Sequence, residues 1–254
     1  MDLESDFRDG ILVLRINRPE AANALNAEVM TGIGMAMREA DRDAAVRVVI
    51  LTGTGDRAFC AGMDLKSFGQ GGIDRTDPGF VAFTRFLRLG ISKPVIGAAN
   101  ATAVAGGFEL LLACDLIVAA ETARFGLPEV KRGLFAGGGG MLLGTRIPIA
   151  LALELGLTGE MIDAERAHSL GLLNRVVPSA EVFDVAFSLA TSIRDNAPLA
   201  VIATKRLMCN ALAATREQTW GDQELMRATV YESNDAQEGT RAFIEKRRAN
   251  WSGT

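Results

Sequence analysis

Two glutamates occupy positions from which a carboxyl group could exchange protons with a bound substrate. Glu109 lies in the first turn of an expected helix, flanked by Phe108 and by the leucines 110–112. It therefore either caps that helix or is held in an apolar pocket. Glu129 follows Pro128 and could be an exposed loop acid. If both carboxyls lay at one site, one could accept a proton while the other supplied one.

Turns of small residues lie in the same parts of the chain. The segments 58–66 and 103–110 are rich in Ala and Gly, and such turns let a backbone N–H approach a ligand closely. The run 137–140 consists of four glycines but lacks the Lys-Ser/Thr pair of a phosphate loop. Its amides could open a helix and bind an anion or a water, or the run could be a close-packing turn.

Other signals for catalysis or cofactor binding are weak. Residues 53–58 read G-x-G-x-x-A after a strand, but no sustained helical period follows, as a dinucleotide site would require. His168 is the single histidine; its setting is typical of an exposed helix face, so we expect a structural role and no metal site. Cys60, Cys114 and Cys209 form no CxxC pair and are expected to be buried or idle thiols in a reducing cytoplasm.

The composition is that of a soluble globular protein, with 48% hydrophobic and 23% charged residues among 254. A formal net charge of −4 gives no basic field for nucleic acid or an anionic membrane. No apolar stretch reaches the roughly 18 residues of a membrane span, and the acidic first residues do not resemble a secretion signal. We therefore expect a small-molecule or protein partner and a cytoplasmic location.

An alternating α/β order must position these residues. The predicted buried strands are 11–16, 46–52, 94–99 and 116–119. Helical spacing follows Asn26, a predicted N-cap, and recurs at 80–89 and 108–113. After about residue 148 the pattern becomes helical, with 175–177 left as a short strand. The predicted helices of this part are 149–157, 163–170, 179–195, 198–214 and 216–230.

At these residues the sequence resembles the crotonase superfamily, which includes enoyl-CoA hydratases and isomerases. The resemblance covers nearly the whole chain. The matching motifs are Asn17-Arg18-Pro19, Asn23-Ala24-Leu25-Asn26, the segments 58–66, 103–115 and 125–140, Leu157-Thr158-Gly159, 171–177, 238–239 and 242–247.

The resemblance implies a fold, an assembly and an oxyanion site. The fold is an α/β spiral of ββα turns, with residues 1–195 as the core that carries the active site. Residues 196–254 form a helical region that builds homotrimers, often paired as homohexamers. The backbone N–H groups of Met63 and Gly106 are implied to hold the thioester oxygen, on which charge accumulates as an enolate.

The resemblance also implies roles for the two carboxyls. Hydratases of this superfamily carry two glutamates, and Glu109 and Glu129 match them. Glu109 would activate water and Glu129 would protonate the α-carbon, with the roles reversed in dehydration; the amide of Gly137 would help to hold the water. Burial and a neighbouring carboxylate should raise at least one pKa, so that a proton is available near neutrality. The expected function is reversible addition of water to the double bond of a 2-enoyl-CoA.

Contacts to CoA are implied at both ends of the chain, and no separate cofactor is implied because CoA is part of the substrate. The matching positions are Ala22, Ala61, Met63, Asp64, Leu65, Lys66, Phe243 and Lys246. The last two match residues that often reach CoA from a neighbouring subunit. Glu20 stands where many relatives have a basic residue, and Ala249 where proline is usual, so these contacts could be rearranged or made by the main chain.

Three alternatives remain open at this point. The segment 107–110 also resembles carnitinyl-CoA dehydratases, which act on a polar acyl group. A double-bond isomerase is disfavoured, since isomerases generally rely on one acid. A non-catalytic acyl-CoA-binding member would keep the turns and use the glutamates structurally. The sequence leaves the length and polarity of the acyl chain undetermined.

Overall fold

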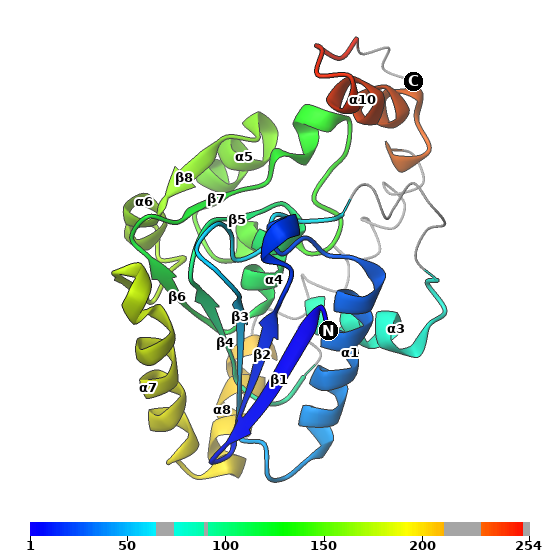
Figure 1. Cartoon of the computed structure of the whole chain (residues 1–254). Helices are drawn as coiled ribbons and strands as arrows, with labels where there is room; N and C mark the ends of the chain where they lie inside the picture. Colours follow the sequence, from blue (N-terminus) through cyan, green and yellow to red (C-terminus); the bar gives the residue numbers. More distant parts are fainter. Residues whose placement is uncertain (65–73, 89–90, 211–229, 251–254) are drawn as a thin grey trace.

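The structure, a computed structural model, describes residues 1–64, 74–88, 91–210 and 230–250. Within these residues the larger sheet has six strands, in the order β1-β2-β3-β4-β6-β9 (Figure 1). β1 pairs antiparallel with β2, and the other neighbours are parallel. The strands are β1 (Leu3–Arg8), β2 (Ile11–Ile16), β3 (Val48–Gly53), β4 (Val95–Ala99), β6 (Leu116–Ala120) and β9 (Arg175–Val177). β3 and β4 are buried along their whole length, as expected of parallel strands covered on both faces.

A second sheet joins three short strands of the described chain, β5 (Ala103–Val104), β7 (Arg124–Gly126) and β8 (Met161–Asp163). The prediction that 175–177 is the last strand left after residue 148 is wrong, because β8 pairs antiparallel with β7. β8 has only three residues, none of them buried, so it leaves no apolar run in the sequence. β1, β5 and β7 were not predicted either.

The chain alternates between the two sheets. It passes from β4 to β5, through helix α4 (Gly106–Ala113), and then from β6 to β7. This path is the expected spiral of ββα turns. It brings the turn before α4 and the turn after β7 next to each other, since Ala105 N–H donates to the carbonyl of Gly126 over 3.0 Å.

Helices cover both faces of the larger sheet (Figure 1). α1 (Ala27–Arg42) begins at the predicted cap, where the Asn26 side chain accepts from the Val29 N–H over 2.8 Å. It packs on α3 (Pro78–Leu87) and on β1 and β2. α7 (Val182–Arg194) packs on β2, β3, β4 and β6 from the opposite side. The core between these layers is aliphatic, with buried aromatic rings at Phe59, Phe86, Phe108 and Phe125.

The second half of the chain is largely helical, as predicted. Its elements are η2 (Pro128–Arg132), η3 (Gly140–Thr145), α5 (Ile149–Thr158), α6 (Ala164–Ser169), η4 (Ser179–Glu181), α8 (Pro198–Asn210) and α10 (Asn234–Ile244). The predicted helix 216–230 lies almost wholly outside the described residues. α10 was matched by family resemblance and not predicted as a helix. It packs on η2 at the upper right of Figure 1.

Two further predictions are confirmed. Residues 54–58 form a bend and not a helix, so the nucleotide fingerprint lacks the helix that it needs. Cys60 and Cys114 are buried free thiols and Cys209 is a half-buried one; burial raises the pKa of Cys60 and of Cys114 to about 12. In the part of the chain that the structure describes, no helix combines the length and apolarity that crossing a membrane would require.

Candidate functional site

The turn that carries Met63 is bracketed by Leu25. Leu25 N–H donates to the carbonyl of Gly62 over 2.7 Å, and Asp64 N–H donates to the carbonyl of Leu25 over 2.9 Å. Leu25 and Met63 thus form a one-residue parallel bridge. In such a bridge the flanking peptide groups of Met63 bond to Leu25, so the N–H of Met63 itself points to the opposite side.

Gly106 begins α4 on that opposite side. A Cβ built on Gly62 would lie 3.2 Å from the amide nitrogen of Gly106, and one built on Gly106 would lie 3.8 Å from that of Met63. Gly62 has a φ of +90° and Ala105 a φ of +52°. A positive φ is strained for alanine, and strain of this kind concentrates at functional sites. The two turns therefore approach as closely as glycine allows.

Neither amide is used by the fold. Among the described residues, the N–H groups of Met63 and Gly106 donate to no backbone or side-chain acceptor. The N–H of Gly106 is one of the first donors of α4, which have no partner inside the helix. Two adjacent unpartnered amides form a preorganised site for an oxygen that gains negative charge.

Glu109 is held by the glycine run. It is 6% exposed, and its Oε1 accepts from the N–H groups of Gly138, Gly139 and Gly140, each over 2.8 Å. α4 has no side-chain cap, so of the two interpretations of Glu109, the buried one is confirmed. Of the possibilities left open for the glycine run, the amides of 138–140 bind a carboxyl group, and this group belongs to Glu109. Three amide donors on one oxygen fix the position of this carboxyl group.

Glu129 lies in a less polar environment. It belongs to η2, directly after β7, and among the described residues its buried Oε2 has no hydrogen-bond partner. Burial and, second to it, the nearby charge of Glu109 raise the pKa of Glu129 to about 7, against a backbone hydrogen bond and the charge of Arg132, which lower it. The alternative of an exposed loop acid is therefore wrong. A carboxyl that keeps its proton near neutrality beside one held as a carboxylate is an arrangement suited to acid–base catalysis.

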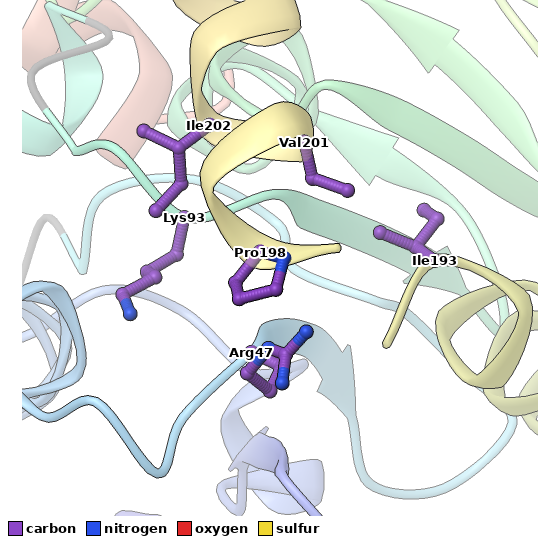
Figure 2. A pocket seen from close by; sticks show the side chains of 6 residues that line it. All are labelled: Arg47, Lys93, Ile193, Pro198, Val201 and Ile202. Atoms are coloured by element: carbon purple, nitrogen blue, oxygen red, sulfur yellow. The ribbon is translucent and has the colours of Figure 1, made fainter. Parts of the chain in front are cut away.

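The site lies at the carboxyl ends of the parallel strands. The Met63 turn follows β3, and the Gly106 turn follows β4 and β5. Figure 2 shows a small cavity at the other end of the sheet, beneath α8, where Arg47 precedes β3 and Lys93 precedes β4. Ligands of parallel α/β sheets bind outside the carboxyl ends, so this cavity is not part of the site.

Metal ligands do not gather in the described ranges, where no group of three or more His, Cys, Asp or Glu side chains could hold an ion. His168 is exposed on α6, and its Nδ1 lies 2.8 Å from the carbonyl of Leu173. Its expected structural role fits this contact.

Known proteins resemble this chain in sequence and in fold. Residues 6–254 match the sequence profile of the family described as enoyl-CoA hydratase/isomerase. The chain belongs to this family. It is 38% identical to a carnitinyl-CoA dehydratase of Proteus mirabilis, covering 97% of this chain and 96% of that one. Solved structures agree, and the crotonase fold predicted from the sequence is confirmed.

Two solved structures illustrate the likeness. A carnitinyl-CoA hydratase of Mycobacterium avium is 42% identical, with a TM-score of 0.93 over 100% of this chain and 99% of that one. An enoyl-CoA hydratase of Mycobacterium tuberculosis H37Rv is 47% identical, with a TM-score of 0.77 over the same shares. The prediction of an enzyme of the hydratase or dehydratase type, a hydro-lyase, is confirmed at that level.

The residues predicted to contact CoA fall into two groups. Ala22, Ala61 and Asp64 lie together, because Ala61 N–H donates to the carbonyl of Ala22 over 3.1 Å and Asp64 follows the Met63 turn. Phe243 and Lys246 belong to α10 and the residues after it. Leu65 and Lys66 lie outside the described residues. The role of every one of these residues in CoA binding stays a prediction.

Sequence reasoning missed three supporting features. Asp64 is ion-paired with Arg18 over 3.0 Å, and both side chains are mostly buried. Leu25 sets the direction of the Met63 amide. The positive charge of Arg132 lowers the pKa of Glu129. Arg18 and Leu25 lie in motifs that carried the resemblance, which is the one signal that could have found them.

Proposed function

We propose that the protein reversibly adds water to the double bond of a 2-enoyl-CoA thioester. The amides of Met63 and Gly106 hold the thioester oxygen while negative charge builds on it. Each such donor contributes on the order of 3 kcal/mol to the transition state by analogy with other oxyanion sites. Selective stabilisation of this enolate is what makes the β-carbon reactive towards water.

The two carboxyls handle the protons. Glu109 takes a proton from water as the oxygen attacks the β-carbon, and Glu129 delivers its proton to the α-carbon; dehydration runs the same steps backwards. The N–H of Gly137 holds the water. The observation that carries this assignment is the contrast between the pair: Glu109 bonded to three amides, Glu129 with a buried, unpartnered oxygen and a pKa near 7.

A second candidate is dehydration of a polar hydroxyacyl-CoA such as carnitinyl-CoA. The curated relative of Proteus mirabilis and the Mycobacterium avium structure carry names of this activity. The chemistry is the same hydro-lyase step run towards the enoyl thioester. The two candidates therefore differ in the acyl group and in the direction of use.

The test is a panel of straight-chain 2-enoyl-CoA thioesters together with carnitinyl-CoA, followed by the absorbance of the conjugated enoyl thioester. Loss of absorbance with the straight chains supports the first candidate, and a gain with carnitinyl-CoA supports the second. Glu109→Gln and Glu129→Gln should abolish either change, while Glu154→Gln, at an exposed site on α5, should not. Double-bond migration without hydration would indicate an isomerase, and binding without turnover would refute catalysis.

We further propose that residues 196–254 assemble the protein into a homotrimer or homohexamer around the 1–195 core, in the cytoplasm. Exposed apolar side chains on the C-terminal helices support this assembly; they are Leu199, Leu207, Met208 and Ile244. Light scattering after gel filtration tests it: a mass of about three or six chains is expected, and a monomer would contradict it.

A further inference from the structure

Helix α10 rests directly on the turn that carries Glu129. Gly239 has no room for a side chain, because a Cβ there would lie 2.0 Å from the carbonyl oxygen of Arg132. One helical turn later, the guanidinium carbon of Arg132 lies 4.6 Å from the centre of the Phe243 ring, within cation–π range. Two residues at i and i+4 on one face of α10 thus hold both the backbone and the side chain of Arg132.

Arg132 is in turn tied to Glu129 by the geometry of η2. The carbonyl of Glu129 accepts from Leu134 N–H over 3.1 Å, so the backbone turns tightly around residues 129–134. The guanidinium charge lowers the pKa of Glu129, against burial and Glu109, which raise it. Any displacement of Arg132 therefore changes the electrostatic environment of the Glu129 carboxyl.

Other charged side chains around η2 are ion-paired or exposed to solvent. Lys131 binds Glu160 over 2.6 Å. On α10, Glu238 pairs with Arg247, and Arg241 is exposed. Glu154 on α5, the other helix packed on η2, is exposed as well. The charged groups that act on Glu129 are Glu109 and Arg132.

We propose that α10 is a positioning element for the acid of the reaction, in which Gly239 and Phe243 fix the place of Arg132, whose charge acts on Glu129. This inference rests on the proposed role of Glu129. It assigns Phe243 a function within its own chain, through Arg132 and without contact to the reacting atoms. It also links the C-terminal region to the chemistry of the core.

The test compares kcat and KM across pH for the wild type, Phe243→Leu, Arg132→Gln and the double variant. Either single variant should shift the alkaline limb of the kcat/KM profile to higher pH by roughly half a pH unit, because the Arg132 charge no longer lowers the pKa of Glu129. The double variant should move it no further than Arg132→Gln, because Phe243 acts through Arg132. A change in KM alone, or shifts that add, would overturn the proposal and leave Phe243 as a CoA contact.

A matched pair of glycine variants tests the packing. Gly239→Ala should separate α10 from η2 and displace the Glu129 carboxyl, and this displacement should lower kcat at least tenfold. Gly156→Ala places a Cβ in open space on α5, which also packs on η2, and should behave as wild type. Equal effects of the two would contradict the positioning role.

A carbon-13 NMR titration of the Glu129 carboxyl, assigned with Glu129→Gln, separates this proposal from the proposed function. The pKa of Glu129 should rise in Arg132→Gln and Phe243→Leu whether or not any thioester is turned over. An unchanged titration in an active enzyme overturns the positioning role alone. A shifted titration in an inactive enzyme overturns the hydratase role alone.

Discussion

Glu129→Gln should stabilise the folded protein while abolishing its activity. Burial, with the Glu109 charge second, raises the pKa of Glu129 from 4.5 to about 7. The folded state therefore binds more protons than the unfolded state between these values, so stability falls as pH rises through this window. At about 1.4 kcal/mol per pH unit, ionising Glu129 costs the fold roughly 3 kcal/mol above pH 7. A neutral amide removes this cost.

The assay is urea unfolding at pH 5 and pH 8, at one protein concentration because assembly would change the apparent stability. The free energy of unfolding of Glu129→Gln minus that of wild type should be about 2 to 3 kcal/mol larger at pH 8 than at pH 5, which means that the variant is the more stable protein at pH 8. Comparing two pH values cancels the effect of the amide itself. Glu154→Gln, at an exposed position, should show no such difference. An advantage of the same size at both pH values would refute the reasoning.

Three other predictions follow from the same contacts. Glu109→Ala should lower the free energy of unfolding by about 3 kcal/mol or more, since three amides lose their acceptor. Glu109→Gln keeps an acceptor oxygen and should lower mainly kcat. Equal unfolding midpoints for the two variants would contradict this. Gly138→Ala places a Cβ 2.7 Å from Oε2 of Glu109 and should lower kcat at least tenfold in a steady-state assay; wild-type turnover would argue against a fixed carboxylate. The kcat/KM of hydration and of dehydration should fall together above about pH 7, because both reactions need the free enzyme with one proton on the Glu109–Glu129 pair. If kcat/KM fell at different pH values in the two reactions, the two reactions would not depend on the same proton.

Much of the fold could be predicted because burial leaves a mark in the sequence. β3 and β4 are covered on both faces and read as unbroken apolar runs, and Asn26 caps α1 through a local contact. β8 has three residues and none is buried, so no periodicity marks it. α10 mixes polar, charged and small residues, and its packing depends on Gly239.

The candidate site was predictable in its residues but not in its contacts. Glu109 and Glu129 were identified by residue type and motif. The partners of Glu109 lie 29 to 31 residues further along the chain. The bridge between Leu25 and Met63 pairs only these two residues, which are far apart in the sequence. Neither contact follows from local propensity, because both depend on how separate turns of the spiral meet.

A crystal structure of the inactive Glu109→Gln variant with a bound 2-enoyl-CoA tests the central claim most directly. The thioester oxygen should lie about 3 Å from the amide nitrogens of both Met63 and Gly106, with the Glu129 carboxyl facing the α-carbon. A thioester oxygen bound away from these two amides, or a Glu129 carboxyl turned from the α-carbon, would contradict the account.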